Sequence, residues 1–314
     1  MNLSKSALVF PGQGSQSLGM LKDFFDNKKI FSETFDEAKE ILSVDFKSLI
    51  FSDKNEDLSR TEITQPLMLA SNIALWRELN LDPKSFGAMA GHSLGEFAAL
   101  VAGGVIEFHD ALKVVSIRAK LMQEAVPEGR GAIAAIIGLN YDAIELICLD
   151  ITNSEQELVS PANINSPIQI VISGTSKGVD LAMERCKKEG AKRTLPLAMS
   201  VPAHCKLMGD AAVQFSDHLK KIKFLTPRIK IFQNYDAAYT MDVEKIVTNL
   251  VHQIDNPVRW VETINNINAL GINTFIECGP GKVLSGLVKR IVNNVEIMSL
   301  DDYSTFKEIF DKHK

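Results

Sequence analysis

Short apolar runs alternate along the chain with longer segments of helical periodicity. Ser6–Phe10 is an apolar run that ends at Pro11-Gly12, which predicts a buried strand followed by a tight loop. Residues 86–90 form a second run, and the small and apolar residues 97–105 after it predict a buried helix. Strands and helices in alternation predict an α/β fold.

Similar patterns continue on both sides of these segments. Residues 31–42 have the periodicity of a helix, and Gln65-Pro66 opens a helical stretch in which the proline suits the first turn. Near the end of the chain, residues 224–232 and Thr274–Glu277 predict two further strands with helices between them.

The segment from 131 to 199 has a denser alternation of elements. The pattern predicts strand 132–138, helix 141–150, strand 157–162, strand 169–173, helix 177–189 and strand 192–197. This βαββαβ order is that of a ferredoxin-like unit. We therefore predict a ferredoxin-like subdomain, residues 130–199, inserted into a large α/β-hydrolase-like domain that is discontinuous in sequence, residues 1–129 and 200–314.

Composition narrows the class of protein. The 314 residues, 46% of them apolar, can bury a full core, and a net charge of −5 argues against a nucleic-acid partner. The four cysteines are scattered without metal-ligand spacing, so we expect free thiols and no metal. We expect neither a signal peptide nor a membrane span, and we predict a cytoplasmic location.

One pentapeptide carries a signature of nucleophilic chemistry. Gly91-His92-Ser93-Leu94-Gly95 fits G-x-S-x-G, in which glycines permit a strained turn that presents a serine at a helix N-terminus. It lies between a predicted strand and a predicted helix, the context that this mechanism requires. The alternative is an ordinary turn with an inert serine.

A serine nucleophile needs a base, and six histidines compete for this role. His204 lies in a constrained segment, 200–205, directly after the predicted subdomain. His92 is adjacent to the serine, where strand geometry would turn its side chain away. From the residues alone, a structural histidine in the partial core is the favoured interpretation of His204, and a catalytic role needs further support.

Four separated motifs occur in an order and at a spacing that resemble a known family. They are VFPGQGSQ at 9–16, GHSLGE at 91–96, VPAHC at 201–205 and GPGKVL at 279–284. Together they resemble the acyltransferases of the dissociated (type II) fatty-acid synthase, the malonyl-CoA:acyl carrier protein transacylases. The resemblance covers nearly the whole chain.

The resemblance implies a dyad of Ser93 and His204, in which a backbone carbonyl near Gln253 holds the imidazole. Glu96, one turn after the serine, is the alternative as a third triad member, although a carboxylate at a helix N-terminus is already explained by the helix dipole. The implied reaction moves a malonyl group from malonyl-CoA through a malonyl-serine to the phosphopantetheine thiol of acyl carrier protein, with ping-pong kinetics.

Further roles follow from the same resemblance. The backbone amides of Gln13 and Leu94 would bind the oxyanion, Arg118 would pair with the malonyl carboxylate, and Asn163 would line the cleft. The alternatives are a helix-surface arginine and a turn asparagine. Ala203 stands where relatives often carry serine.

Other classes of protein remain as rivals. Neither the glycines near residue 12 nor those near 280 match a dinucleotide loop or a P-loop, so we expect no cofactor. A serine hydrolase or thioesterase would use the same elbow, and a non-catalytic carrier-binding module would never acylate Ser93. An acidic carrier protein would need a local basic patch, for which the candidates are Lys187, Lys188, Lys192, Arg193, Lys289 and Arg290.

Overall fold

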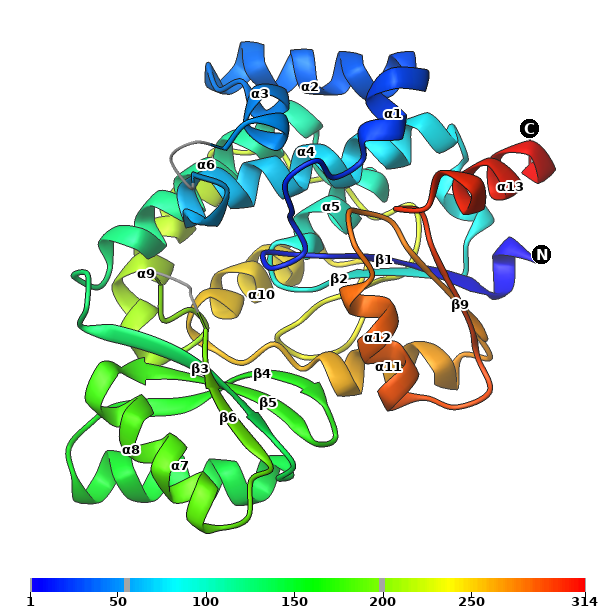
Figure 1. Ribbon diagram of the computed structural model, residues 1–314. Helices are drawn as coiled ribbons and strands as arrows, with labels where there is room; N and C mark the ends of the chain where they lie inside the picture. Colours follow the sequence, from blue (N-terminus) through cyan, green and yellow to red (C-terminus); the bar gives the residue numbers. More distant parts are fainter. Residues whose placement is uncertain (1, 54–56, 198–200, 314) are drawn as a thin grey trace.

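The computed structural model describes residues 2–53, 57–197 and 201–313. A five-stranded sheet in the order β7-β2-β1-β8-β9 crosses the larger part of the molecule, and all of its pairings are parallel (Figure 1). Its strands are β1 (Ser6–Phe10), β2 (Ala88–Gly91), β7 (Ile231–Phe232), β8 (Thr274–Glu277) and β9 (Glu296–Ser299). The strands predicted at Ser6–Phe10 and Thr274–Glu277 are confirmed.

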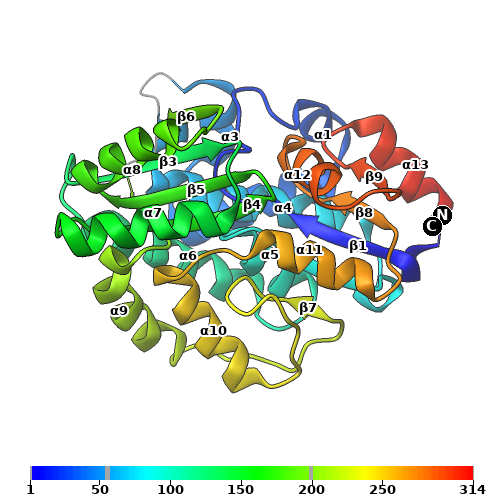
Figure 2. The same cartoon turned by 90° about the horizontal axis from the view of Figure 1, so that it is seen from below.

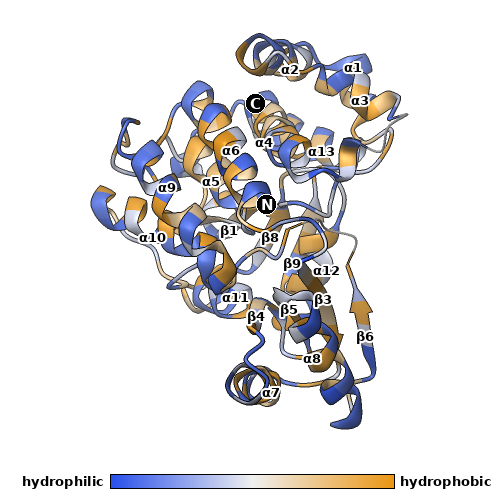
Figure 3. Cartoon of the chain, turned by 90° about the vertical axis from the view of Figure 1, so that its left-hand side faces the viewer, coloured by the Kyte–Doolittle hydropathy of each residue, from blue (hydrophilic) through white to orange (hydrophobic). Residues whose placement is uncertain are grey.

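Side chains of β1 alternate between two apolar cores. Leu8 and Phe10 belong to the core formed with the helices on one face, whereas Ala7 and Val9 belong to the core on the other. Because successive strand residues point to opposite faces, a sheet covered on both sides must be apolar at every position, and β1 is fully buried. Figure 3 shows the corresponding apolar colouring along the inner elements.

More helices cover one face of the five-stranded sheet than the other. The larger layer consists of α2 (Lys29–Leu42), α4 (Thr61–Leu79), α5 (Gly95–Ala102), α6 (Phe108–Glu124), α9 (Gly209–Leu219) and α10 (Val243–Asp255). The opposite face carries α11 (Trp260–Ala269) and α12 (Val283–Ile291). The shorter or peripheral helices are α1 (Lys22–Asn27), α3 (Phe46–Phe51) and α13 (Tyr303–His313), and the two termini lie near each other in both views (Figures 1 and 2).

A separate antiparallel sheet has the strand order β4-β5-β3-β6. Its elements, in chain order, are β3 (Gly131–Ile137), α7 (Tyr141–Ser154), β4 (Val159–Ser166), β5 (Gln169–Thr175), α8 (Ser176–Lys188) and β6 (Arg193–Pro196). The predicted βαββαβ order is therefore confirmed. Ala134 and Ile136 pack with α7 and α8, whereas Ile133 and Ala135 face the other way, toward the larger sheet.

The two sheets are joined by direct contacts. In β4, Ala162 and Ile164 exchange backbone hydrogen bonds with Val258, and the Ser173 hydroxyl donates to the carbonyl of Ala203 over 2.7 Å. The predicted boundary between residues 199 and 200 lies outside the described residues, and the division into two domains stays a prediction.

Two local predictions are wrong. Residues 224–230 form no strand, and only Ile231–Phe232 joins the sheet, at its edge, where it pairs with Met89 and Ala90 of β2. Pro66 lies inside α4 and not in its first turn. The helix begins at Thr61, where the hydroxyl of Thr64 donates to the carbonyl of Leu58 and anchors the preceding turn.

Candidate active site

Ser93 lies on a sharp turn between β2 and α5. Its backbone has φ 51°, in the left-handed region that most side chains avoid. Space explains the flanking glycines: a Cβ on Gly91 would lie 1.9 Å from the carbonyl carbon of Gly95, and one on Gly95 would lie 2.0 Å from the carbonyl oxygen of Phe10. Gly91 therefore allows the turn to close on itself, and Gly95 allows it to pack against β1.

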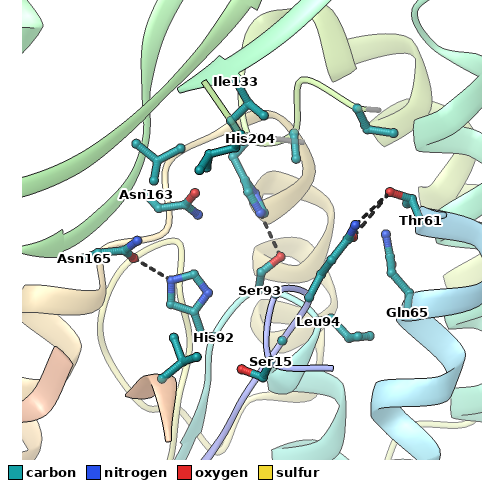
Figure 4. A pocket seen from close by; sticks show the side chains of 18 of the residues that line it. Ser15, Thr61, Gln65, His92, Ser93, Leu94, Ile133, Asn163, Asn165 and His204 are labelled. Carbon is teal, nitrogen blue, oxygen red and sulfur yellow. Dashed lines mark hydrogen bonds between the residues drawn. The ribbon is translucent and has the colours of Figure 1, made fainter. Parts of the chain in front are cut away.

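His204 lies directly opposite this serine (Figure 4). Its Nε2 is 2.8 Å from Ser93 Oγ, and its Nδ1 is 2.7 Å from the backbone carbonyl of Gln253. Because a carbonyl can only accept, the proton lies on Nδ1, and Nε2 is left to accept the serine hydroxyl. The contact with a carbonyl near Gln253, expected from the sequence, is present.

The histidine is held neutral by its surroundings. It is 3% exposed, and burial lowers its pKa to about 3, with the positive charge of Arg118 acting in the same direction. His204 also has a positive φ of 63°, and its backbone amide donates to the carbonyl of Ile254 on α10. At neutral pH the ring is therefore an unprotonated acceptor pointed at Ser93.

The loop after β1 lies against the elbow. A Cβ on Gly12 would lie 2.5 Å from the carbonyl oxygen of His92 and 3.7 Å from the amide nitrogen of Leu94. This close approach places the loop that carries Gln13 against the elbow, and Gln13 and Leu94 both line the same cavity. Neither of their backbone amides donates to another of the residues that the structure describes, which leaves both able to bind an oxyanion.

Arg118 reaches the same site from α6. Its guanidinium is 1% exposed and donates to Gln65 Oε1 over 2.5 Å, to Gln253 Oε1 over 3.0 Å and to Ser93 Oγ over 3.2 Å. Burial lowers its pKa to about 10, so the group still carries its charge at neutral pH. The sequence alternative of a helix-surface arginine is wrong.

These residues line one cavity of about 290 Å³ between the two sheets. Asn163 and Val171, from the smaller sheet, form part of its wall, and Asn163 lies within β4 and not in a turn. Two positions along the same strand, Asn165 Oδ1 is 2.7 Å from Nε2 of His92 (Figure 4). The cleft thus combines the elbow from the large sheet with strand β4 from the small one.

Glu96 is not a third triad member. Both of its oxygens are occupied: Oε1 accepts from Gln233 Nε2, and Oε2 accepts from Asn234 N and Gln253 Nε2. Burial raises its pKa to about 7, although these hydrogen bonds act in the opposite direction. The third position beside His204 belongs to a backbone carbonyl.

Several polar residues of the site were missed from the sequence. Gln65 contacts Arg118, Asn234 contacts the backbone of Ser93, and Gln253 acts through its side chain as well as its carbonyl. The sequence contains little that would have identified them. For Gln65, the one indication is its spacing: it follows Thr61 by one helical turn, so that both side chains face the cavity. The helix spacing does account for the burial of Arg118, since it shares a helix face with the buried, apolar Val114 and Met122.

Other kinds of site find no support in the described part of the chain. No cluster of three or more potential metal ligands occurs among those residues. None of the helices that the structure describes combines the length and apolarity needed to cross a bilayer. All four cysteines are buried and unpaired, as expected.

The sequence of this chain is similar to that of known acyl transferases. A model described as "Acyl transferase domain" matches residues 7–302. The chain is 46% identical over 312 residues to a malonyl CoA-acyl carrier protein transacylase of Haemophilus influenzae, covering 98% of both proteins. It is 42% identical to the protein of the same name from Bacillus subtilis, covering 97% of this chain and 96% of the other.

Solved structures of proteins with related sequences have the same fold as this chain. A crystal structure of an acyl carrier protein S-malonyltransferase from Vibrio cholerae superposes with a TM-score of 0.93 at 45% identity, covering 98% of this chain and all of the other. A malonyl-transacylase in complex with a type II PKS acyl-carrier protein superposes with a TM-score of 0.94 at 44% identity, covering 98% of this chain and 99% of the other.

The fold, the nucleophile elbow and the comparisons together define an acyl transferase. More narrowly, the chain belongs to the malonyl CoA-acyl carrier protein transacylase family.

Proposed function

We propose that this protein transfers the malonyl group of malonyl-CoA to the phosphopantetheine thiol of acyl carrier protein and so supplies extender units for fatty acid synthesis. The observation that carries this proposal is the position of Arg118: a buried, charged guanidinium lies 3.2 Å from Ser93 Oγ. A site that takes uncharged acyl groups has no use for a buried cation, whereas a malonyl carboxylate matches it with charge-assisted hydrogen bonds.

In the first half of the reaction, Ser93 is acylated. His204 Nε2 accepts the proton of Ser93 Oγ while the oxygen attacks the thioester carbonyl of malonyl-CoA. The amides of Gln13 and Leu94 stabilise the oxyanion, and the Gln253 carbonyl stabilises the imidazolium through Nδ1–H. The carbon–sulfur bond then breaks, and His204 gives its proton to the leaving thiolate.

The second half runs in the opposite sense. The phosphopantetheine thiol gives its proton to His204, and the thiolate attacks the malonyl ester carbonyl. When the ester bond breaks, His204 returns the proton to Ser93 Oγ. Throughout, Arg118 holds the malonyl carboxylate, and Asn163 bounds the cleft from the side of β4. Two substrates that use one site in turn give ping-pong kinetics.

The remaining parts of the proposal concern the setting of the reaction. We place the docking of the acidic carrier protein on a basic patch of exposed side chains, whose members are Lys187, Lys188, Lys192, Arg193, Lys289 and Arg290. Residues 1–129 with 200–314 would form the catalytic domain, and 130–199 the subdomain that closes the cleft. A cytoplasmic location suits four buried, unpaired cysteines.

Intact-mass analysis after incubation with malonyl-CoA tests the proposal. The wild type should gain one malonyl group and lose it to added carrier protein, while Ser93→Ala should gain none. An adduct that only water removes would favour a hydrolase, the rival that shares this elbow. If wild type forms no adduct, the covalent mechanism is wrong, and a carrier-binding module becomes the better account.

A further inference from the structure

Glu96 is a buried carboxylate for which the reaction above has no use. It lies one turn beyond Ser93 and is fully buried. Oε1 accepts a hydrogen bond of 3.1 Å from Gln233 Nε2, and Oε2 accepts bonds of 2.9 Å from Asn234 N and 2.8 Å from Gln253 Nε2. All three partners donate and the carboxyl oxygens only accept in these contacts, so Glu96 sets the direction in which each side-chain amide points.

For Gln253, this direction decides what Arg118 meets. Its Nε2 is turned toward Glu96 and toward the carbonyl of Ser93, 3.1 Å away. Its Oε1 therefore faces the opposite way and accepts from the Arg118 guanidinium over 3.0 Å. A reversed amide would present its own N–H groups to that guanidinium, which has only donors, and the contact would be lost.

Asn234 depends on the same carboxylate. Its backbone amide donates to Glu96, while its side chain spans the elbow: Oδ1 accepts from the amide of Ser93 over 2.6 Å, and Nδ2 donates to the carbonyl of Gly91 over 2.7 Å. Glu96 thus touches both of the residues that brace the strained turn and the arginine. It does not itself line the cavity.

We infer that Glu96 is a positioning residue for acyl selectivity: by fixing the amide of Gln253, it holds the Arg118 guanidinium in the orientation that receives a substrate carboxylate. This inference rests on the proposed function, since it names how that site prefers a carboxylated acyl group. Glu96 acts only through other side chains, and it never contacts the acyl group.

Glu96→Gln tests this role, because it keeps the shape of the side chain but replaces one of the two acceptor oxygens by a donor NH2, which must then face at least one of the groups that donate to Glu96. We expect the ratio of serine acylation rates with malonyl-CoA and acetyl-CoA to fall about tenfold, the value of one oriented charge-assisted hydrogen bond. Glu78→Gln is the matched control: a second buried carboxylate, on α4, about 20 Å along the helix from Gln65. Its ratio should stay that of wild type.

A double-mutant cycle separates positioning from a general loss of structure. In an Arg118→Ala background, Glu96→Gln should lower the ratio no further, because both changes act on one contact. Equal slowing with both acyl groups, or an undiminished effect without the arginine, would overturn the inference. Gln253→Met, which keeps the backbone carbonyl for His204, should reproduce the loss of selectivity, and it decides the matter if Glu96→Gln does not fold. Failure of wild type to take malonyl would instead refute the proposed function.

Discussion

Replacing Arg118 by alanine removes the cationic side chain that, among the described residues, donates to Ser93 Oγ and suits a substrate carboxylate. A guanidinium that forms two hydrogen bonds to a carboxylate contributes about 1.5 to 3 kcal/mol for each bond. Their loss corresponds to about a 10²- to 10⁴-fold slower acylation by malonyl-CoA, at about 1.4 kcal/mol for each factor of ten. Acetyl-CoA lacks the carboxylate, so its rate should change by less than about tenfold.

The assay is quenched-flow acylation at pH 7, with the acyl-enzyme quantified by intact mass. At this pH Arg118 is charged, since its pKa is about 10. Arg118→Lys should fall between wild type and alanine, because lysine keeps the charge but not the planar fork. Arg77→Ala is the control, since Arg77 pairs with Glu37 and packs on Phe108 away from the cavity. Equal slowing of malonyl and acetyl transfer in Arg118→Ala would refute the reasoning.

Three further predictions concern packing, protonation and docking. Gly95→Ala should lower the free energy of unfolding by at least about 2 kcal/mol in denaturant titrations, because its Cβ would lie 2.0 Å from the carbonyl oxygen of Phe10. His204→Gln should lose less stability than wild type between pH 7.5 and 5, by about 2 kcal/mol, since wild type must keep a histidine of lowered pKa neutral below its ordinary pKa. Lys289→Glu should raise KM for carrier protein several-fold without changing acylation by malonyl-CoA.

Each of these three predictions has an outcome that would contradict it, and the packing and docking predictions also have a control variant. Gly286→Ala, on α12, meets no atom within 4 Å and should not destabilise the protein, and equal stability of the two alanine variants would exclude the packing argument. The sign for His204 is fixed: its stabilising contribution is present above pH 6.5 and is lost as the pH falls toward 3. Parallel pH curves for wild type and variant would contradict it. Lys29→Glu, an exposed lysine on α2, should leave the KM for carrier protein unchanged, and no change with Lys289→Glu would reject the patch.

Much of the fold could be predicted from local patterns. β1 and β8 were found to the residue because their apolar runs stop at glycine or proline, and the βαββαβ order followed from six short elements with clear changes of period. The strand at 224–232 was predicted too long because an apolar run does not reveal how much of it finds a pairing partner. Only Ile231 and Phe232 pair with β2, at Met89 and Ala90, and Phe232 also forms a bridge with Tyr239.

The site, too, has one part that could be predicted from the sequence and another that could not. The elbow could be recognised because its sequence signal is local: Gly91, Ser93 and Gly95 lie within five residues, and the two glycines have no room for a Cβ. Arg118 and His204 could be given roles only through resemblance. The hydrogen bond between Ser93 and His204 joins residues 111 positions apart, and the bond from Arg118 to Gln253 spans 135.

By itself, the sequence determined the alternation of strands and helices and the turn that presents the serine, because both depend on steric and apolar patterns among neighbours in the chain. Only the tertiary structure decided that a backbone carbonyl, and not Glu96, holds the histidine. It also decided that the carboxylate turns toward Gln253 and Asn234. The physical reason is that a buried polar group takes whichever partner packing brings within about 3 Å, and no local pattern contains that distance.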